Sequence, residues 1–449
     1  MMHFMAALLL GAATPQDSPA SGKFRGEVVD PATKDIIMKV RMQIPDKRPE
    51  GVPWGLIFVC HGFQGHENNS YLDGTVAALK RQGVADQYLV IAGKAKGEGW
   101  TSDDDPRVLR LFAWARERYP VDPRRVFLFG SSNGARFVCR FGLEHQDKIA
   151  GVVSYCGNHN FSSMTSSDDP AETRTEWYFV HGGKDRPEGS RRACDELRRK
   201  GYRYVFRQLD GYGHTDIWDG KGHPDLSVVD AVRDDWALWI HSLRHKTMAL
   251  PDQDHKALEA LPVTMEEAAR IGGPSAAAAV VIALTSAEDK IRESAARTAG
   301  TVRFGPPVVK ALLAALDVPA EPVRKEAASS VARLAGWRVV EAQLALMRRA
   351  RDKDVPAAAR ARALRALGEA LRLAYHGNFE DKAPFWTLVL ALEDADAAVR
   401  AAALEGLKPA AADGLGFDPA GTAEARAAAA AKWRDWCREH CGAPEEALK

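Results

Sequence analysis

The hydrophobic and polar positions of the chain follow two different rhythms, and the change between them falls near residue 247. Before that point, short apolar runs alternate with segments in which apolar residues recur every three or four positions. After it, nearly every segment has the helical period and is rich in Ala, Leu, Arg and Glu. The two rhythms predict two structural units of different class.

The apolar runs of the first unit predict strands of a mainly parallel sheet, because continuous apolar runs suit strands buried on both faces. The expected strands are 26–30, 36–44, 56–60, 88–92, 125–129, 150–155, 177–180 and 202–209. The first two should form a hairpin. Helices are expected at 72–81, 106–118, 133–143, 189–200 and 225–244. This alternation predicts an α/β fold, in which ligands bind at the carboxyl ends of the strands.

The second unit has a repetitive, all-helical pattern. Small-residue, arginine-rich helices are expected at 290–300, 323–336, 359–371 and 399–407. Second helices are expected at 307–316, 337–350 and 385–392. The pairs recur roughly every 32 to 38 residues, which is the period of an α-solenoid, and their texture resembles HEAT-like repeats. A non-repetitive bundle is the alternative, because Ala-rich helices resemble one another by composition alone.

These patterns divide the chain into four parts. The apolar run 4–13 ends in small residues and is too short to span a bilayer, so residues 1–20 are expected to form a signal peptide. The protein is then expected to be secreted or periplasmic. The α/β catalytic unit should cover 23–246 and the HEAT-like helical repeats 276–441. Several prolines and glycines make 247–275 the expected linker.

Charge and cysteine content narrow the classes of partner. The net charge of +1 gives neither a nucleic-acid footprint nor a preference for anionic membranes, and no later segment has the pattern of a membrane span. Six cysteines are compatible with disulfides or with buried thiols, so no pairing is predicted. Cys437 and Cys441, four residues apart on an expected helix, are interpreted as a chance pair.

One strand-to-helix junction carries the strongest chemical signal. The apolar segment 126–129 leads into GSSNG at 130–134, and an amphipathic helix follows. In this context the G-x-S-x-G pattern predicts a sharp turn that lifts the hydroxyl of Ser132 above the sheet, with glycines to relieve crowding. Ser132 is therefore the predicted nucleophile. The alternatives are a capping serine in a glycine-rich turn and the less central Ser131.

A nucleophilic serine needs a histidine base and an acid that orients the base, and at such a junction the acid comes next in the chain. Two strands after Ser132 stands HGGKD at 181–185, and Asp185 falls on a strand-end loop. Asp185 is the predicted acid. The alternative is an ordinary turn aspartate that pairs with Lys184 or Arg186.

The predicted base is His214, which follows the next strand in GYGH at 211–214. The glycines allow the loop to bring the imidazole back toward the serine. His223 is the second candidate for the base, although its neighbouring proline favours a structural role. Asp210 is the second candidate for the acid, but it lies too near His214 along the chain for the usual geometry.

Backbone amides are expected to complete the site. An oxyanion needs two N–H donors, one from the residue after the nucleophile, Asn133, and one from the loop after the strand 56–60. That loop reads HGFQG at 61–65, and the N–H of Phe63 is proposed, with Gln64 as the alternative.

A metal centre is not expected. His61, His66 and His159 could suggest one, but their spacing matches no zinc signature. His61 is interpreted as a scaffold residue. No metal or other cofactor is predicted.

Four of these segments together resemble a known superfamily. They are CHG at 60–62, GSSNG at 130–134, HGGKD at 181–185 and GYGH at 211–214. They resemble the α/β-hydrolases, and within them are most similar to polyhydroxybutyrate depolymerase-like and feruloyl-esterase-like carboxylesterases, over about residues 25–245.

The resemblance implies an α/β-hydrolase sheet domain with a catalytic triad. It places Ser132, Asp185 and His214 in the triad and the backbone amides of Phe63 and Asn133 in the oxyanion hole. The compact esterases have no counterpart of the helical C-terminal part.

One departure from the family pattern bears on the substrate. Arg136 stands near the position where members often have a second glycine, and it could line or obstruct the pocket mouth. Trp100 and Trp218 flank strand-end loops, where they either bind an aromatic or sugar-linked acyl group or pack in the core.

Taken together, the residues favour a serine hydrolase that cleaves carboxylic esters, small or polymeric, without a cofactor. A serine peptidase on the same triad is the first alternative. The second is a binding protein in which the helical repeats hold a protein partner.

Overall fold

A computed structural model describes residues 21–46, 53–157, 159–162, 175–219, 226–243, 265, 268, 273–301, 306–372, 382–411 and 413–444. The expected signal peptide, most of the expected linker and His223 lie outside these residues. Among the described residues, no helix is both long enough and apolar enough to cross a bilayer.

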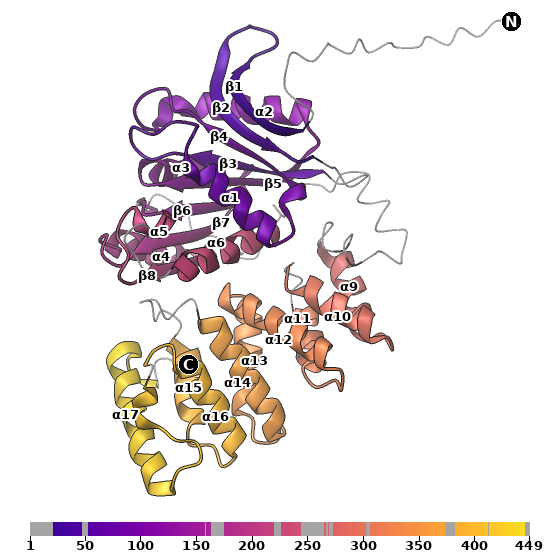
Figure 1. The fold of residues 1–449 in the computed structure, drawn as a ribbon, viewed down its shortest axis with the longest axis vertical. Coiled ribbons are helices and arrows are strands. Elements are labelled where there is room, and N and C mark those ends of the chain that lie inside the picture. The colour runs from indigo at the N-terminus through magenta and orange to yellow at the C-terminus, as the bar shows by residue number, and fades with distance from the viewer. Residues whose placement is uncertain are drawn as a thin grey trace, which may run out of the picture.

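Eight strands form one sheet in the order β1-β2-β4-β3-β5-β6-β7-β8 (Figure 1). Strands β3 to β8 are parallel, whereas β2 is antiparallel to both β1 and β4. The strands are β1 Gly22–Val29, β2 Ile36–Ile44, β3 Trp54–Cys60, β4 Tyr88–Gly93, β5 Val121–Ser131, β6 Gly151–Tyr155, β7 Glu176–Gly182 and β8 Tyr204–Leu209. This is the mainly parallel α/β sheet that the sequence predicted, including its N-terminal hairpin.

Helices cover both faces of the sheet. Alternate strand residues point to opposite sides, so Phe127 and Phe129 of β5 join one core cluster and Leu128 joins the other. The first cluster is closed by α1 Ser70–Arg81 and α6 Leu226–His241. The second is closed by α2 Asp105–Arg118, α3 Asn133–Glu144 and α4 Glu188–Arg199. Short helices η1 Ala85–Gln87, η2 Ser102–Asp104 and α5 Asp216–Asp219 lie in the loops.

The second half of the chain is helical, as the sequence predicted. Its helices are α9 Gly273–Leu284, α10 Asp289–Ala299, α11 Pro306–Ala315, α12 Glu321–Gly336, α13 Val340–Arg351, α14 Ala357–Leu371, α15 Lys382–Ala391, α16 Ala397–Leu407, η3 Gly414–Gly416 and α17 Ala423–Cys441. They form two layers. Helices α10, α12, α14 and α16 pack in succession in one layer, and α9, α11, α13, α15 and α17 in the other (Figure 1).

One hydrogen-bonding arrangement recurs along this helical part. An arginine near the start of a helix donates its guanidinium to backbone carbonyls of the loop before that helix. The arginines are Arg292, Arg324, Arg360, Arg400 and Arg426, in helices α10, α12, α14, α16 and α17. The recurrence shows that successive helix–loop units are built alike.

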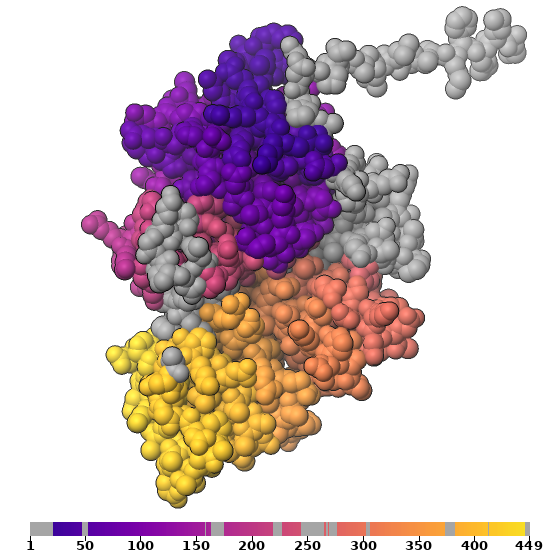
Figure 2. Space-filling model, in the orientation of Figure 1, coloured from indigo at the N-terminus to yellow at the C-terminus, as the bar shows by residue number. Residues whose placement is uncertain are grey.

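The two parts of the chain are joined by a buried polar network beside the sheet's last strand. Arg207 of β8 donates to the carboxylate of Asp235 in α6 at 3.1 Å and to the carbonyl of Gly336, at the end of α12, at 2.8 Å. Trp337 Nε1 donates to the other oxygen of Asp235 at 2.8 Å. Figure 2 shows the helical part lying directly against the sheet domain.

Candidate active site

Ser132 occupies a strained turn between β5 and α3. Its φ of 54° is in the left-handed region, which a non-glycine residue adopts only at a cost. A Cβ on Gly130 would lie 2.3 Å from the carbonyl oxygen of Gly134, and one on Gly134 would lie 2.4 Å from that of His61. Only glycine fits at these two positions. The turn therefore has the geometry of a nucleophile elbow.

Asp185 and His214 meet above the carboxyl ends of β7 and β8. Asp185 Oδ2 lies 2.6 Å from His214 Nδ1, with side chains 24% and 45% exposed. The carboxylate of Asp210, the second candidate for the acid, accepts instead from the side chain of Gln208 at 2.7 Å. Of the two candidates for the acid, Asp185 is therefore the one that contacts His214.

His181, at the end of β7, holds the turn that carries Asp185. It is buried, and its Nε2 lies 2.9 Å from the Asp185 carbonyl and its Nδ1 2.8 Å from the Ser190 hydroxyl. Burial lowers the pKa of His181, so the ring is neutral at pH 7. In this state one nitrogen donates and the other accepts. His181 was not among the site residues predicted from the sequence.

The loop after β3 lies beside the nucleophile, and two of its backbone amides, those of Phe63 and Gln64, were candidates for the oxyanion hole. The N–H of Gln64 is used by the carbonyl of Glu98 at 2.6 Å, so it is not available to a substrate. Within the described part of the chain, no backbone carbonyl accepts from the N–H of Phe63. A Cβ on Gly62 would lie 3.5 Å from Ser132 Cβ, so this loop borders the serine. Of the two predicted oxyanion donors, the geometry favours Phe63 over Gln64.

Further hydrogen bonds hold this loop and the segments beside it in place. The side chain of Asn133 accepts from the N–H of Trp100 at 2.6 Å, and Lys94 Nζ donates to the carbonyls of Gly65 and Gly97 at 2.8 and 3.1 Å. His61 is fully buried and accepts from the N–H of Ala95 at 3.2 Å, as expected of a scaffold residue. The amide of Phe63 is therefore held in place before a substrate arrives.

The structure does not join all the candidate catalytic groups. Among the hydrogen bonds of the described residues, none links the Ser132 hydroxyl to His214. Serine and histidine come from loops after β5 and β8 and are brought to the same edge of the sheet, whereas the acid and histidine are in direct contact.

The two tryptophans beside the strand-end loops belong to the core. Trp100 is 3% exposed and packs against Phe58 and Phe137, and Trp218 is 5% exposed and packs against Phe129. Both side chains therefore pack in the core, which is one of the two roles considered for them. The aromatic residue that is exposed at the site is Phe63, at 61%. Arg136 is also exposed, in the first turn of α3.

Two groups of described side chains come close enough to consider as metal ligands. In one, Cys156 joins Asp185 and His214, with the ligand atoms within 4.8 Å of one another. The other contains Asp105 and Glu144, but Arg140 already forms ion pairs with both carboxylates. All six cysteines are buried thiols, including the pair in α17.

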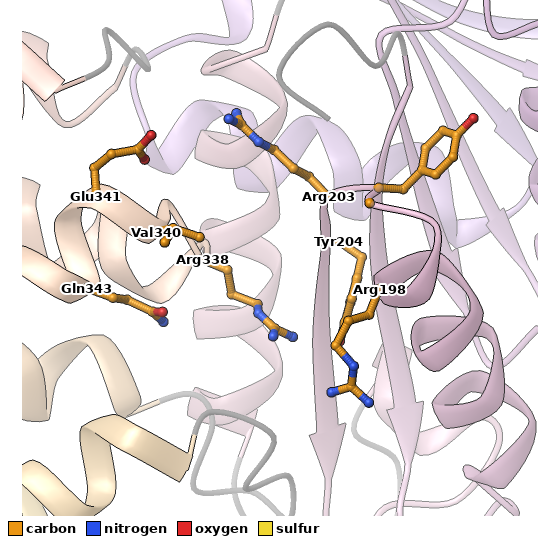
Figure 3. A pocket seen from close by; sticks show the side chains of 9 residues that line it. Arg198, Arg203, Tyr204, Arg338, Val340, Glu341 and Gln343 are labelled. Atoms are coloured by element: carbon orange, nitrogen blue, oxygen red, sulfur yellow. The ribbon is translucent and has the colours of Figure 1, made fainter. Parts of the chain in front are cut away.

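A separate pocket of about 300 Å³ lies between the two parts of the chain. Figure 3 shows Arg198, Arg203 and Tyr204 facing Arg338 and Glu341 from the helical part. None of the predicted catalytic residues lines it. It holds charged groups of both signs and is distinct from the edge of the sheet that carries Ser132.

Parts of the chain are similar to several esterases. No family model matches the chain. A curated relative named "Putative esterase NocK", from Nocardia uniformis subsp. tsuyamanensis, is 32% identical over 125 residues, which cover 24% of this chain and 34% of NocK. The chain therefore matches about a third of that relative's length.

Several solved structures of esterases match part of the chain at low sequence identity. A thermostable esterase matches at 16% identity and a TM-score of 0.39, covering 50% of this chain and 63% of that one. A ferulic acid esterase matches at 13% identity and a TM-score of 0.39, covering 49% and 96%. An S-formylglutathione hydrolase from Agrobacterium tumefaciens matches at 14% identity and a TM-score of 0.36, covering 50% and 97%.

Proposed function

We propose that the chain is a serine hydrolase that cleaves carboxylic esters through an acyl-enzyme. Ser132 attacks the acyl carbon while His214 takes its proton. His214 then delivers that proton to the leaving alcohol, and a water molecule, activated by the same imidazole, releases the acid. Asp185 orients the imidazole and stabilises its protonated form.

The observation that carries this proposal is the contact of 2.6 Å between Asp185 and His214 at the sheet edge that also holds the Ser132 turn. An aspartate with only a turn-forming role would not be expected to contact a histidine from the loop after the next strand. In unliganded hydrolases the serine–histidine contact is often long and tightens when substrate binds. We therefore assign Ser132 and His214 as partners in the reacting complex.

The proposed oxyanion hole consists of the amides of Phe63 and Asn133. As the acyl carbon becomes tetrahedral, negative charge develops on its oxygen, and two fixed N–H donors stabilise that charge. Asn133 lies at the start of α3, where a helix N–H has no intrahelical acceptor. The free Phe63 amide supplies the second donor.

The experiment that tests this function is hydrolysis of p-nitrophenyl esters from acetate to octanoate by the wild type and by Ser132→Ala. We expect at least about a 10⁴-fold loss in kcat in the variant, because the nucleophile is removed. Ser131→Ala is the matched control and should retain activity. Equal rates in wild type and Ser132→Ala would contradict the assignment.

The acyl group and the polymer are the finer part of the proposal. We propose an acyl group that packs against the exposed ring of Phe63. The resemblance noted in the sequence favours hydroxyalkanoate polyesters or feruloyl esters. The chain-length profile, methyl ferulate and a polyhydroxybutyrate film distinguish these substrates. Peptide anilides test the peptidase alternative, which requires faster cleavage of amides than of esters.

For the rest of the chain, we propose HEAT-like repeats and export. The two-layer packing and the recurring arginines support repetition. Export is proposed from the apolar run near the N-terminus, and N-terminal sequencing of the protein from the culture medium or periplasm would test it. A protein partner on the helical part is testable by pulldown with the full chain.

A further inference from the structure

Cys156 lies between the loops that carry the proposed nucleophile and the proposed acid. It follows β6, and the strand order places β6 between β5, which leads to Ser132, and β7, which leads to Asp185. Its N–H donates to the carbonyl of Val180 at 2.9 Å, and its φ of 49° turns the chain sharply at this point. The residue is 7% exposed.

The thiol of Cys156 has two polar neighbours, the backbone of Gly182 and the carboxylate of Asp185. Its sulfur lies within 4.8 Å of a carboxylate oxygen of Asp185. Burial, together with the negative charge of Asp185, raises the pKa of the thiol well above its ordinary value. The group therefore stays protonated at neutral pH and acts as a donor.

The geometry also places the thiol near the base. Cys156 Sγ, a carboxylate oxygen of Asp185 and a ring nitrogen of His214 lie within 4.8 Å of one another. From β7, His181 Nε2 is 3.4 Å from Asp185 Oδ2. The carboxylate thus has His214, Cys156 and His181 around it, but His181 donates to the Asp185 carbonyl. Cys156 therefore supplies the additional side chain that lies close enough to direct a donor at the carboxylate itself.

We propose that Cys156 is a positioning residue, whose thiol holds the carboxylate of Asp185 so that Oδ2 faces His214 Nδ1. This inference rests on the proposed function. An aspartate carboxylate rotates easily about its last torsion, so one hydrogen bond to His214 leaves its orientation loosely defined. A second donor, fixed by the backbone of β6 and by Gly182, narrows that freedom. A well-oriented acid then keeps the imidazole in the tautomer that accepts the serine proton.

The test compares Cys156→Ala, Cys156→Gly and Cys156→Ser with the wild type in hydrolysis of p-nitrophenyl acetate across pH 5 to 9. Alanine and glycine remove the donor, and glycine also relaxes the positive φ. Serine keeps an O–H donor at the same position. Cys139→Ala is the control, because Cys139 is another buried cysteine of the sheet domain and neighbours Ser154 rather than the acid. Thermal unfolding establishes that each variant is folded.

We expect kcat to fall about tenfold in the alanine and glycine variants, while KM changes less than about twofold, because the base is misplaced and the substrate pocket is intact. The acidic limb of the pH–kcat/KM profile should move up by about half a unit. A carboxylate without the thiol donor is a stronger negative neighbour and stabilises the protonated imidazole. Serine should restore both the rate and the profile, and Cys139→Ala should match the wild type.

Two results would overturn the proposal: a wild-type rate and pH profile in folded Cys156→Gly or Cys156→Ala, or a serine variant as impaired as alanine. If alanine fails to fold, the glycine and serine variants decide. Failure of the proposed function itself is recognised separately, because Ser132→Ala would then keep the activity whatever the Cys156 variants do.

Discussion

At the scale of single residues, Asp185 is the best-defined group of the site. Its carboxylate contacts His214, its carbonyl contacts His181, and its N–H donates to the carbonyl of Gly182 at 3.0 Å. Three contacts with three different atoms fix the residue as a whole. A turn aspartate whose side chain only pairs with a neighbouring lysine or arginine would not require these three contacts.

Asp185→Asn tests this assignment without a change in size. The amide can donate to the imidazole and thereby favour the wrong tautomer, and it cannot stabilise the imidazolium. We expect kcat to fall by about 10³- to 10⁴-fold, with unfolding temperature nearly unchanged. Asp210→Asn is the matched control and should stay within about threefold of wild type. Comparable losses in both variants would argue that neither is the acid.

Site residues could be predicted from the sequence where they directly follow a strand that the apolar pattern predicts. Ser132 and His214 were predicted because each follows a strand that the apolar pattern reveals, and the structure places them after β5 and β8. The sequence also put Phe63 ahead of Gln64, but it could not supply the reason, which is a hydrogen bond from the N–H of Gln64 to Glu98 in a different loop. Cys156 also follows a predicted strand, and that position was the signal that could have revealed it.

At the scale of elements, the recurring arginines explain how one helix–loop unit is joined to the next. Arg400 is 6% exposed, and its guanidinium donates to the carbonyls of Asp394, Ala395 and Pro419 at 2.7 to 3.0 Å. Carbonyls in a loop between packed helices have few other donors, and leaving them unsatisfied is costly. The arginine thus supplies hydrogen-bond donors to the loop carbonyls that would otherwise be buried without a partner.

Arg400→Met should lower the free energy of unfolding by about 3 kcal/mol, because the methionine fills the space but leaves buried carbonyls without their donor. Arg365→Met is the control. Arg365 pairs with Glu405 on the surface at 3.2 Å with its side chain 50% exposed, so the change should be below about 0.5 kcal/mol. Urea unfolding followed by circular dichroism measures both. Equal losses in the two variants would show that the buried contacts contribute nothing particular.

Element positions were predicted well because buried parallel strands and amphipathic helices carry strong local patterns. The sequence places the end of the linker at 275, whereas α9 begins at Gly273. Glycine and proline are turn signals, but proline is also favoured in the first turn of a helix, and only the packed structure distinguishes the two cases.

At the scale of the whole molecule, buried polar groups of the sheet domain form hydrogen bonds with the helical part. Arg207 and Asp235 contact Gly336 and Trp337 in this way. Arg207 is 5% exposed and belongs to the last strand of the sheet, where an uncovered edge would be open to other chains. The Tyr178 hydroxyl also donates to Asp235. No local pattern in the sequence predicts this contact, since it joins residues more than 100 positions apart.

The dependence of the two parts on each other can be measured with Asp235→Asn. Asp235 neutralises the buried Arg207 and accepts from Trp337, so the neutral amide leaves a buried cation uncompensated and presents donors to donors. We expect a loss of about 3 kcal/mol and a calorimetric transition that separates into two, because the helical part loses its tie to the sheet domain. Asp230→Asn on the same helix is the control: Asp230 is 47% exposed and pairs with Arg81 and Arg233 on the surface, so its loss should leave one transition near the wild-type midpoint. If Asp235→Asn also unfolds in a single transition at that midpoint, the apolar contacts between the two parts hold them together, and the Asp235 network is dispensable.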